Sequence, residues 1–395
     1  MRKRTVTPCL PALLLLALSL ASFTALCVLR GAPMADLLVY RAEGAAVAHG
    51  TDLYGFTVTR WRLPATYPPF AALLFLPAAW LPVPALKAAV VAGNVLLLAT
   101  LVALSARLVS RPPTPALLCT ATALALWLEP VFQTLLYGQI NLAVTCLTLW
   151  DLTRPPGARA KGLALGIAAG IKLTPAVFVA YLLLRGRGRQ AATAAAACAG
   201  SVALGAVLLP SASADFWTRR LWETGRVGKV WIVDNQSLRG LVARILGDPA
   251  PGLAWALPAA AVTVAGLALA ARTRRDSHGV LLTAFTALLV CPISWTHHWV
   301  WCVPLLAVLL AEGRARTAAL TALVFTARTM WLVPHEGDRD LELSWWQQPL
   351  AAAYPVLVLG LLISYDSMIS RCPTLSNEQT GTLTWLSRSF RSARR

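Results

Sequence analysis

The stretch CLPALLLLALSLASFTALCVL, residues 9–29, indicates the fold class of this chain because it is long enough to cross a lipid bilayer as one helix. Three basic residues, Arg2, Lys3 and Arg4, precede it, and the chain becomes polar soon after it ends. A secretory signal peptide has an apolar core of about 7 to 15 residues and a small-residue cleavage site. This segment is longer and lacks an Ala-x-Ala site, so we expect it to remain as a membrane anchor.

The composition of the whole chain also indicates a membrane protein. Hydrophobic residues make up 57% of the 395 positions and charged residues 13%, and the mean hydropathy is +0.63. Soluble proteins carry roughly 25% charged residues. The net charge of +18 arises from basic residues that cluster in short loops between apolar runs, which is typical of positive-inside topology and not of a nucleic-acid-binding surface. We therefore predict an all-α polytopic membrane protein with no nucleic-acid partner.

The apolar segments predict about 10 to 13 transmembrane helices, joined by short loops and amphipathic helices. Segments of full spanning length are 9–29, 84–108, 116–136, 190–210 and 251–271. Shorter candidates are 69–82, 139–152, 279–294, 298–311, 317–333 and 349–364. Residues 1–365 would form this membrane domain, and 366–395 would form a basic, disordered cytoplasmic tail.

The segment 161–184 is interrupted in its middle by Lys172 and Pro175, and basic residues flank both of its ends. If both ends are cytoplasmic, this segment must be a hairpin of two half-helices with Lys172 at its tip. Burying a lone ammonium group in a membrane costs at least about 2.5 to 3.5 kcal/mol, so Lys172 should have an anionic partner such as a lipid phosphate. The competing interpretation is that the side chain extends to the membrane surface.

Polar residues that topology does not explain gather on one side of the membrane. With the N-terminus in the cytoplasm, the extracytoplasmic side receives the segments 30–68, 137–141, 211–250, 296–298 and 335–348. We therefore predict a multi-pass protein of the cell (inner) membrane whose active site is extracytoplasmic.

Asp36 is the first acidic residue of the chain and follows the first span closely. Only 17 residues are Asp or Glu, so a carboxylate beside a membrane helix is a functional candidate. Partly helical spacing over 37–48 predicts an amphipathic helix at the membrane surface. Two interpretations stay open: Asp36 either caps this helix with its side chain, or supplies a carboxylate to an active site outside the bilayer.

The sequence CPISWTHHWVW, residues 291–301, places two adjacent histidines among tryptophans. Indoles prefer the membrane interface, and an imidazole there can bind a phosphate or a metal ion. Adjacent side chains diverge on a helix, so at most one of His297 and His298 should face a shared site. The alternative is that this polar pair only satisfies a helix end.

Two further clusters supply amide and hydroxyl groups: YGQIN at 137–141 and DNQSLR at 234–239. Their donors and acceptors suit sugar hydroxyls or a polar headgroup, although amides at helix ends often satisfy backbone groups instead. The same outer loop carries four cations that suit either anionic headgroups or a solvated surface: Arg219, Arg220, Arg226 and Lys229.

Taken in order, these segments resemble glycosyltransferase family 87, the polyprenyl-phosphate-mannose-dependent α-mannosyltransferases with the GT-C membrane fold. The residues that carry the resemblance lie between 30 and 302. They are Asp36-Leu-Leu-Val-Tyr40, Tyr54, Tyr67-Pro-Pro69, Gly138-Gln-Ile-Asn141, Lys172-Leu-Thr-Pro175, Asn235-Gln-Ser-Leu238 and Pro292-Ile-Ser-Trp-Thr-His-His298.

The resemblance implies an inverting hexosyl transfer that forms an alpha-(1-2) mannoside, with Asp36 as the general base. The candidates for binding the donor phosphate are His297, His298, Lys172 and Arg239. The candidates for binding the other parts of the substrates are Tyr40, Tyr54, Tyr67, Gln139, Asn141, Asn235 and Gln236. We expect no cofactor and a metal-independent reaction, although a divalent metal held by Asp36 and a histidine stays open.

The implied partners are a polyprenyl-phosphate sugar donor, a glycolipid or lipoglycan acceptor, and membrane lipids. Members of the family build phosphatidylinositol mannosides and the branches of lipomannan and lipoarabinomannan, which are cell-wall lipoglycans. An arabinosyltransferase using polyprenyl-phosphate arabinofuranose is one alternative. A lipid or sugar transporter is another, but transporters tend to show repeated halves with paired broken helices. This sequence shows one interruption, no repeat, and polar residues on one side.

Overall fold

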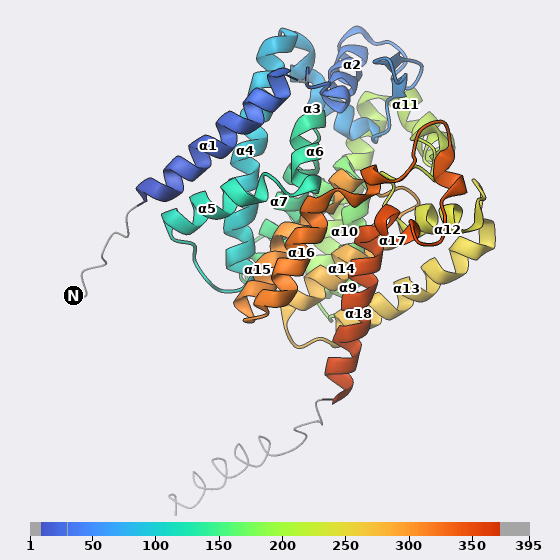
Figure 1. The fold of residues 1–395 in the computed structure, drawn as a ribbon. Coiled ribbons are helices and arrows are strands. Elements are labelled where there is room, and N and C mark those ends of the chain that lie inside the picture. Colours follow the sequence, from blue (N-terminus) through green and yellow to red (C-terminus); the bar gives the residue numbers. More distant parts are fainter. Residues whose placement is uncertain (1–8, 30, 372–395) are drawn as a thin grey trace, which may run out of the picture. The chain divides into compact units, whose positions relative to one another are not determined.

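The computed structural model describes residues 9–29 and 31–371, so Arg2, Lys3 and Arg4 lie outside the described residues. The described chain is mostly helical and has little β-structure, which confirms the predicted all-α class (Figure 1). Its longer elements are α1 (Leu10–Leu29), α2 (Ala35–His49), α3 (Pro69–Trp80), α4 (Val83–Leu108), α5 (Pro115–Ala125), α6 (Glu129–Tyr137), α7 (Asn141–Thr153), α8 (Leu163–Ile171), α9 (Val177–Leu184), α10 (Gly188–Leu208), α12 (Leu238–Leu246), α13 (Gly252–Arg272), α14 (Asp276–Val290), α15 (Cys302–Ala311), α16 (Ala315–Ala327) and α18 (Ala353–Arg371).

Short elements connect these helices. A two-stranded antiparallel ribbon pairs β1 (Thr57–Val58) with β2 (Leu63–Pro64). The remaining short helices are η1 (Thr174–Ala176), α11 (Pro210–Asp215), η2 (Phe216–Arg220), η3 (Thr224–Arg226), η4 (Thr296–Trp301), η5 (Thr329–Leu332), η6 (Arg339–Glu342) and α17 (Gln348–Ala351).

Within the described residues, four helices are long and apolar enough to cross a membrane: α1, α4, α10 and α13. All four were predicted as full-length spans. The further apolar helices of 10–17 residues coincide with shorter candidates or with part of the interrupted segment. The protein is therefore a multi-pass membrane protein. The predicted number of 10 to 13 spans includes these shorter apolar helices, which are shorter than a bilayer crossing.

The predicted span 116–136 is not one continuous helix. This segment is split into α5 and α6, which meet at an angle of 77°. The break falls just before Pro130, which lies in the first turn of α6. Proline has no backbone N–H for a preceding helical turn, and it disfavours the helical conformation of the residue before it. Hydropathy alone does not register either effect.

The predicted hairpin around Lys172 is present. α8 packs along α10, with Gly162 beside Gln190 and Gly170 beside Ser201. α9 then ends just before α10 begins, so it returns to the level at which α8 starts. Lys172 therefore lies at the tip, between the two half-helices.

Charged residues join several helix ends at the base of this hairpin. The Arg185 guanidinium donates to the Ala271 carbonyl at 2.9 Å and pairs with Asp276 at 3.1 Å. Arg275 pairs with Glu312 at 2.7 Å. These contacts bring together the ends of α9, α13, α14 and α15. The basic loops that were predicted to share one side of the membrane are thus neighbours in the fold.

The predicted boundary between residues 365 and 366 falls inside α18, which runs without interruption to Arg371. The chain up to Leu357 forms one compact unit, and a second unit starts at Val358. Residues 372–395 lie outside the described residues, so the disordered tail stays a prediction.

The helix predicted to follow Asp36 is α2, and it packs closely against α3. It is more deeply buried than a helix lying on a membrane surface, because Tyr40, Glu43 and Gly44 are all buried. A Cβ atom on Gly44 would lie 2.3 Å from the carbonyl oxygen of Phe75. Only glycine therefore permits this approach of the two helices, which fixes α2 and the carboxylate in its first turn.

Gly44→Ala is expected to lower the stability of the protein by about 1–3 kcal/mol, the usual cost of overpacking a core. The thermal unfolding midpoint of purified protein in detergent measures this change. Gly93→Ala is the matched control, because Gly93 also lies in a helix but a Cβ atom there meets nothing within 4 Å. Alanine should be tolerated at Gly93, since it favours helix over glycine. Equal midpoints for Gly44→Ala and wild type would contradict the packing described here.

Candidate active site

Asp36 lies in the first turn of α2 and is not its N-cap. The N-cap residue is Met34, which makes no side-chain capping bond. The Met34 N–H donates to the carbonyl of Leu136 at 3.2 Å and so ties the start of α2 to the end of α6. The interpretation of Asp36 as a helix cap is therefore wrong. The positive end of the α2 dipole still favours the ionised carboxylate.

Gly138 allows the segment after α6 to pass close to Asp36. Its φ of +71° is a left-handed conformation that suits glycine, and a Cβ atom there would lie 2.7 Å from Cβ of Leu37. Because Gly138 lies directly against α2, the next residue, Gln139, reaches the Asp36 side chain.

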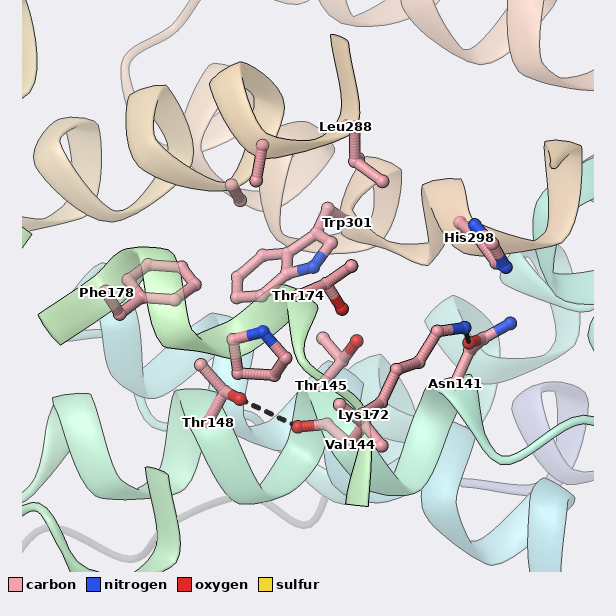
Figure 2. A pocket seen from close by; sticks show the side chains of 13 residues that line it. Asn141, Val144, Thr145, Thr148, Lys172, Thr174, Phe178, Leu288, His298 and Trp301 are labelled. Carbon is pink, nitrogen blue, oxygen red and sulfur yellow. Dashed lines mark hydrogen bonds between the residues drawn. The ribbon is translucent and has the colours of Figure 1, made fainter. Parts of the chain in front are cut away.

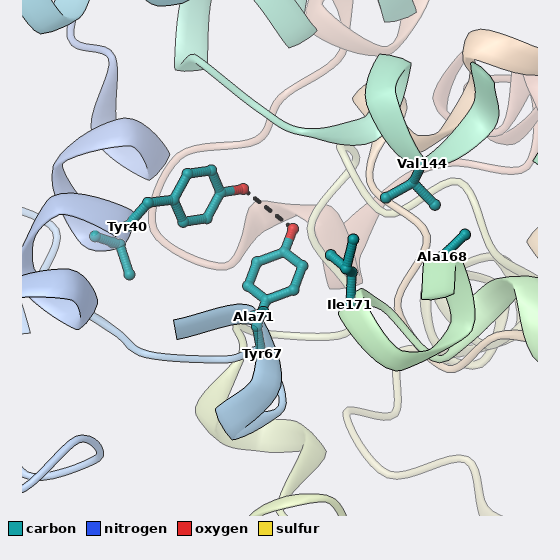
Figure 3. Close-up of a cluster of buried hydrophobic side chains, with 7 residues drawn as sticks. Tyr40, Tyr67, Ala71, Val144, Ala168 and Ile171 are labelled. Carbon is teal, nitrogen blue, oxygen red and sulfur yellow. Dashed lines mark hydrogen bonds between the residues drawn. The ribbon is translucent and has the colours of Figure 1, made fainter. Parts of the chain in front are cut away.

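Gln139 connects Asp36 to two buried tyrosines. The hydroxyl of Tyr40 donates to Gln139 Oε1 at 2.8 Å, and that of Tyr67 donates to the same oxygen at 3.2 Å. The two hydroxyls are 3.1 Å apart and point toward each other from α2 and from the segment before α3 (Figure 3). With its oxygen so occupied, the Gln139 amide nitrogen is the group that hydrogen-bonds the Asp36 carboxylate.

The surroundings of Asp36 favour its neutral form more than water does. Its side chain is only partly exposed, and burial raises the pKa of Asp36 from 3.8 to about 6. The hydrogen bond from Gln139 and the charge of Lys172 lower this pKa, whereas the charge of Asp234 raises it. Asp36 is therefore ionised at neutral pH but close to its titration range, as suits a general base.

A second carboxylate lies on the same face of α2, two turns further along. Glu43 is 1% exposed, and burial raises its pKa to about 8. The backbone of Thr66 and the charge of Arg226 lower this pKa, and the charge of Asp36 raises it. Glu43 is thus largely protonated at neutral pH. It differs from Asp36 in charge state although both belong to one helix.

Lys172 lies inside the protein, so the interpretation that it extends to the membrane surface is wrong. Its ammonium donates to Asn141 Oδ1 at 2.8 Å and lies 5.6 Å from the centre of the Tyr67 ring. The Asn141 amide in turn donates to the carbonyl of His297 at 2.9 Å, an oxygen that also accepts from Thr134 at 3.1 Å. One asparagine therefore connects the hairpin tip, the start of α7 and the histidine segment.

A cavity opens next to this connection. Lys172, Asn141 and His298 lie at one end of it, and Phe178 lies at the other with Trp301 between (Figure 2). One end of the cavity is therefore cationic and polar, while the other is aromatic. This pattern suits a molecule that carries a phosphate on an apolar chain.

The two histidines differ in their surroundings, as expected for adjacent residues. Their rings lie 4.8 Å apart at 85° to each other. His298 lines the cavity. His297 is 4% exposed, packs against the Tyr137 ring at 5.7 Å, and has no hydrogen-bond partner for either ring nitrogen among the described residues. His298 is thus the better placed of the two to contact a phosphate.

Asp234 also belongs to this site, although the sequence analysis did not select it. Its Oδ1 accepts from the Thr296 hydroxyl at 2.6 Å and from the Thr296 N–H at 3.2 Å. Burial raises the pKa of Asp234, and the Thr296 hydrogen bonds lower it. The signal in the sequence was a rare acidic residue directly before an amide cluster in an outer loop.

Asn235 and Gln236, predicted as substrate-binding, have their side chains occupied by backbone groups. Asn235 donates to the carbonyls of Val230 and Pro292, and accepts from the N–H groups of Ser237 and Ser294. Gln236 donates to the carbonyls of Val233 and Ala351, and accepts from the N–H of Tyr354. Both amide side chains therefore hold their loop in place through hydrogen bonds to backbone groups.

Tyr54 and Arg239, also predicted as site residues, form their hydrogen bonds apart from Gln139 and Asn141. The Tyr54 hydroxyl donates to the Tyr67 carbonyl at 2.8 Å, so it supports the segment that carries Tyr67. The Arg239 guanidinium donates to the Thr224 hydroxyl at 3.0 Å and lies over the Trp255 ring. The structure does not bring Arg239 together with Lys172 and His298 at the cavity.

A family model described as glycosyltransferase family 87 matches residues 65–294. The chain belongs to glycosyltransferase family 87. It is 33% identical over 359 residues, or 83% of each chain, to the "Polyprenol-phosphate-mannose-dependent alpha-(1-2)-phosphatidylinositol mannoside mannosyltransferase" of Mycobacterium tuberculosis (strain ATCC 25618 / H37Rv). It is 34% identical over 373 residues to the protein of the same name from Mycolicibacterium smegmatis (strain ATCC 700084 / mc(2)155), covering 83% of this chain and 84% of the relative.

A third relative is named for a phosphatidylinositol pentamannoside. It is the "Polyprenol-phosphate-mannose-dependent alpha-(1-2)-phosphatidylinositol pentamannoside mannosyltransferase" of Mycobacterium tuberculosis (strain CDC 1551 / Oshkosh). The identity is 36% over 316 residues, covering 77% of this chain and 73% of the relative. No solved structure is a significant match.

In this glycosyltransferase, Asp36 and the His297–His298 pair lie outside the matched residues 65–294, on either side of them. The fold returns both segments to the matched part. Met34, two residues before Asp36, donates a hydrogen bond to the carbonyl of Leu136, which lies in the matched part. Thr296, directly before the histidine pair, donates a hydrogen bond to Asp234, which also lies in the matched part.

In this family 87 glycosyltransferase, the four cations of the predicted outer loop, at 219, 220, 226 and 229, are paired with acidic residues. Arg219 and Arg220 both form ion pairs with Asp215, and Lys229 pairs with Asp338. They are thus already partnered without an anionic headgroup. Among the described residues, no group of three or more His, Cys, Asp or Glu side chains is placed to hold a metal ion. Metal independence stays a prediction.

Proposed function

We propose that this glycosyltransferase moves mannose from polyprenyl-phosphate mannose to a phosphatidylinositol mannoside, with Asp36 as the general base. The names of its relatives support the donor and the acceptor class. The observation that carries the proposal is the turn between α6 and α7. Its Gln139 hydrogen-bonds Asp36, and its Asn141 hydrogen-bonds Lys172. One short segment thus positions a carboxylate and a cation, the two charges that an inverting sugar transfer requires.

The proposed reaction is a single displacement. An acceptor hydroxyl attacks the anomeric carbon of the mannosyl donor and gives its proton to Asp36. The bond between that carbon and the phosphate oxygen breaks, and its electron pair leaves with the polyprenyl phosphate. Lys172 and His298 are proposed to stabilise the charge that develops on this phosphate. A β-linked donor then gives an alpha-(1-2) mannoside.

The proposed site faces the extracytoplasmic side of the cell membrane. This assignment is supported by the basic loops, which positive-inside topology places in the cytoplasm. Arg185 and its ion-pair partner Asp276, which follows Arg275 in the chain, lie at the base of the Lys172 hairpin, away from its tip. Single-cysteine labelling of intact cells tests the assignment, because a cysteine at Thr51, in the loop after α2, should react from outside and one at Arg274 should not.

The function is tested with purified protein, polyprenyl-phosphate mannose carrying a radiolabel, and phosphatidylinositol mannosides of increasing mannose number. We expect a labelled lipid product whose new linkage is cleaved by an alpha-(1-2)-specific mannosidase. Polyprenyl-phosphate arabinofuranose is the comparison donor. Transfer of arabinose and not mannose would replace the proposed donor, and transfer to lipomannan alone would replace the proposed acceptor. Net movement of lipid across vesicles without any transfer would overturn the enzymatic assignment of this site.

The kcat/KM for transfer is expected to rise with pH through a midpoint near 6 and to level off above it. Only the ionised carboxylate can accept the proton, and burial raises the pKa of Asp36 to about 6. Rates measured from pH 4 to pH 9 give the midpoint. Glu43, whose pKa is about 8, adds a negative charge near Asp36 at alkaline pH. Glu43→Gln should therefore alter the pH–rate profile only at its alkaline end. A profile in which kcat/KM does not fall at acid pH would contradict the role of Asp36.

A further inference from the structure

Asp234 offers one carboxylate oxygen to a ligand while the other is held by the protein. Both bonds from Thr296 end on Oδ1, at 2.6 Å from its hydroxyl and 3.2 Å from its N–H. Among the side chains of residues 9–29 and 31–364, none forms a hydrogen bond or ion pair with Oδ2, and the residue is partly exposed. The orientation of the carboxylate is therefore fixed, but its hydrogen-bonding capacity is only half used.

The backbone around Asp234 is held more firmly than in an ordinary loop. Its carbonyl accepts from the Thr296 N–H at 2.9 Å, and the Gln236 N–H donates to the Ser294 carbonyl at 2.8 Å. Asn235 pairs with Trp295 in an isolated antiparallel bridge. The two segments thus form a rigid contact directly beside the histidine pair. Such support is what a residue needs to hold a substrate in a defined orientation.

Asp234 lies next to the segment that carries the proposed phosphate-binding residue His298, and within electrostatic reach of the proposed base. Its charge acts on Asp36, and the charges of both carboxylates act on Tyr137. The Tyr137 ring contacts His297, which follows Thr296 in the chain. In an in-line displacement, the transferred sugar occupies the space between the base and the leaving phosphate. Asp234 holds Thr296, two residues before His298, and His298 lines the cavity.

The chemistry of a carboxylate limits what Asp234 can bind there. An ionised carboxylate accepts hydrogen bonds and donates none, so its ligand must supply donors. The donor phosphate supplies only acceptors and negative charge, and so belongs to Lys172 and not to Asp234. The hydroxyl groups of a sugar are neutral donors, and hydrogen bonds from them to an ionised acceptor are stronger than those between neutral groups.

We infer that Asp234 accepts hydrogen bonds from hydroxyl groups of the transferred sugar and so determines which sugar the enzyme takes from its donor. The inference rests on the proposed function, because it assumes that a sugar lies between Asp36 and Lys172. A site that hydrogen-bonds a substrate hydroxyl discriminates strongly against the analogue that lacks it. Asp234 is thus a substrate-contacting residue and not only a support for its loop.

The test combines substitutions at Asp234 with donors that each lack one hydroxyl: the 2-, 3-, 4- and 6-deoxymannosyl polyprenyl phosphates. In the wild type, at least one deoxy donor should lose about 10- to 100-fold in kcat/KM, the usual effect of a hydrogen bond to a charged group. In Asp234→Ala, mannose transfer should fall by a similar factor, and the penalty for that deoxy donor should shrink to about 2-fold or less. Asp234→Asn keeps Oδ1 for Thr296, so it preserves the loop while changing the free oxygen.

Asp340→Asn is the matched structural control. Asp340 is a neighbouring carboxylate that accepts from the Val233 N–H at 2.8 Å, directly before Asp234. Loosening the loop through Asp340 should slow all donors by one common factor. If the Asp234 variants also slow every donor by one common factor, the inference is wrong. If they change the pattern for deoxy acceptors instead, it is likewise wrong. A wild-type protein that transfers no mannose at all would contradict the proposed function itself. That result differs from the two results that would contradict only the role of Asp234.

Discussion

Replacing Asp36 with Asn is expected to lower kcat/KM for mannosyl transfer by about 10²- to 10⁴-fold, the contribution usual for a positioned general base. Asparagine has nearly the same size and can still accept a hydrogen bond from Gln139, but it cannot take a proton from the acceptor hydroxyl. Steady-state rates with radiolabelled donor, over a range of acceptor concentrations, measure the loss. The effect should appear mainly in kcat, because the proton moves only during the reaction.

The Asp36→Asn protein should fold at least as well as the wild type. A carboxyl group whose pKa is raised in the folded state lowers stability above its unfolded pKa, because the folded state must release its proton at a higher pH. For Asp36, the destabilisation grows from pH 3.8 to about pH 6 and persists at neutral pH. The neutral amide avoids it, so the thermal midpoint at pH 7 should not fall.

Asp52→Asn is the matched control for this substitution. Asp52 is an exposed carboxylate in the loop after α2, and its Oδ1 accepts from the Tyr54 N–H at 2.9 Å, a bond that asparagine can also accept. We expect activity within a factor of two of the wild type. If Asp36→Asn also retained such activity, Asp36 would have no part in the reaction. If it lost activity together with its thermal midpoint, the loss would be structural.

Replacing Lys172 with Met is expected to reduce kcat by about 10²- to 10³-fold, as found when one group that stabilises a developing negative charge is removed. Methionine fills similar space but carries no charge. Lys172 is the cation that lines the cavity beside His298. Without it, the leaving phosphate has only neutral donors there. Single-turnover rates with saturating donor separate this loss from weaker donor binding.

Two control variants show whether position or charge matters at Lys172. Lys172→Arg keeps the charge and should recover part of the lost activity, with a deficit from the changed geometry. Lys229→Met removes a lysine that is exposed and paired with Asp338, so it should leave transfer unchanged. A Lys172→Met enzyme that works within a few-fold of the wild type would show that the phosphate is stabilised elsewhere.

Much of the membrane architecture could be predicted because each long apolar helix is continuous in sequence. The four helices of full spanning length were all found, and the Lys172 hairpin followed from basic residues at both of its ends. The bend between α5 and α6 was not predicted. It depends on the missing N–H of Pro130, whereas the hydropathy of the two helices differs little from that of one span.

The site was partly predictable because its charged members are rare and lie in apolar or interfacial sequence. Asp36, Lys172 and His298 stood out for this reason, and the fold gathers them around Gln139 and Asn141.

The amides were harder to predict, since an amide that binds a sugar and one that binds backbone look alike in sequence. Asn235 and Gln236 proved to bond the backbone. Asp234, their acidic neighbour, is the residue of that cluster whose charge acts on Asp36.

The hydrogen bonds that hold the base and the cation in place are made by groups that keep one charge state across ordinary buffers. Gln139 and Asn141 are neutral amides, and burial raises the pKa of the Tyr40 and Tyr67 hydroxyls further above 10.0. Mild acid therefore protonates Asp36 without dismantling the contacts around it. If Asp36 is the base and faces the outside of the cell, as proposed, external acidity would slow mannosyl transfer and a return to neutral pH would restore it without refolding.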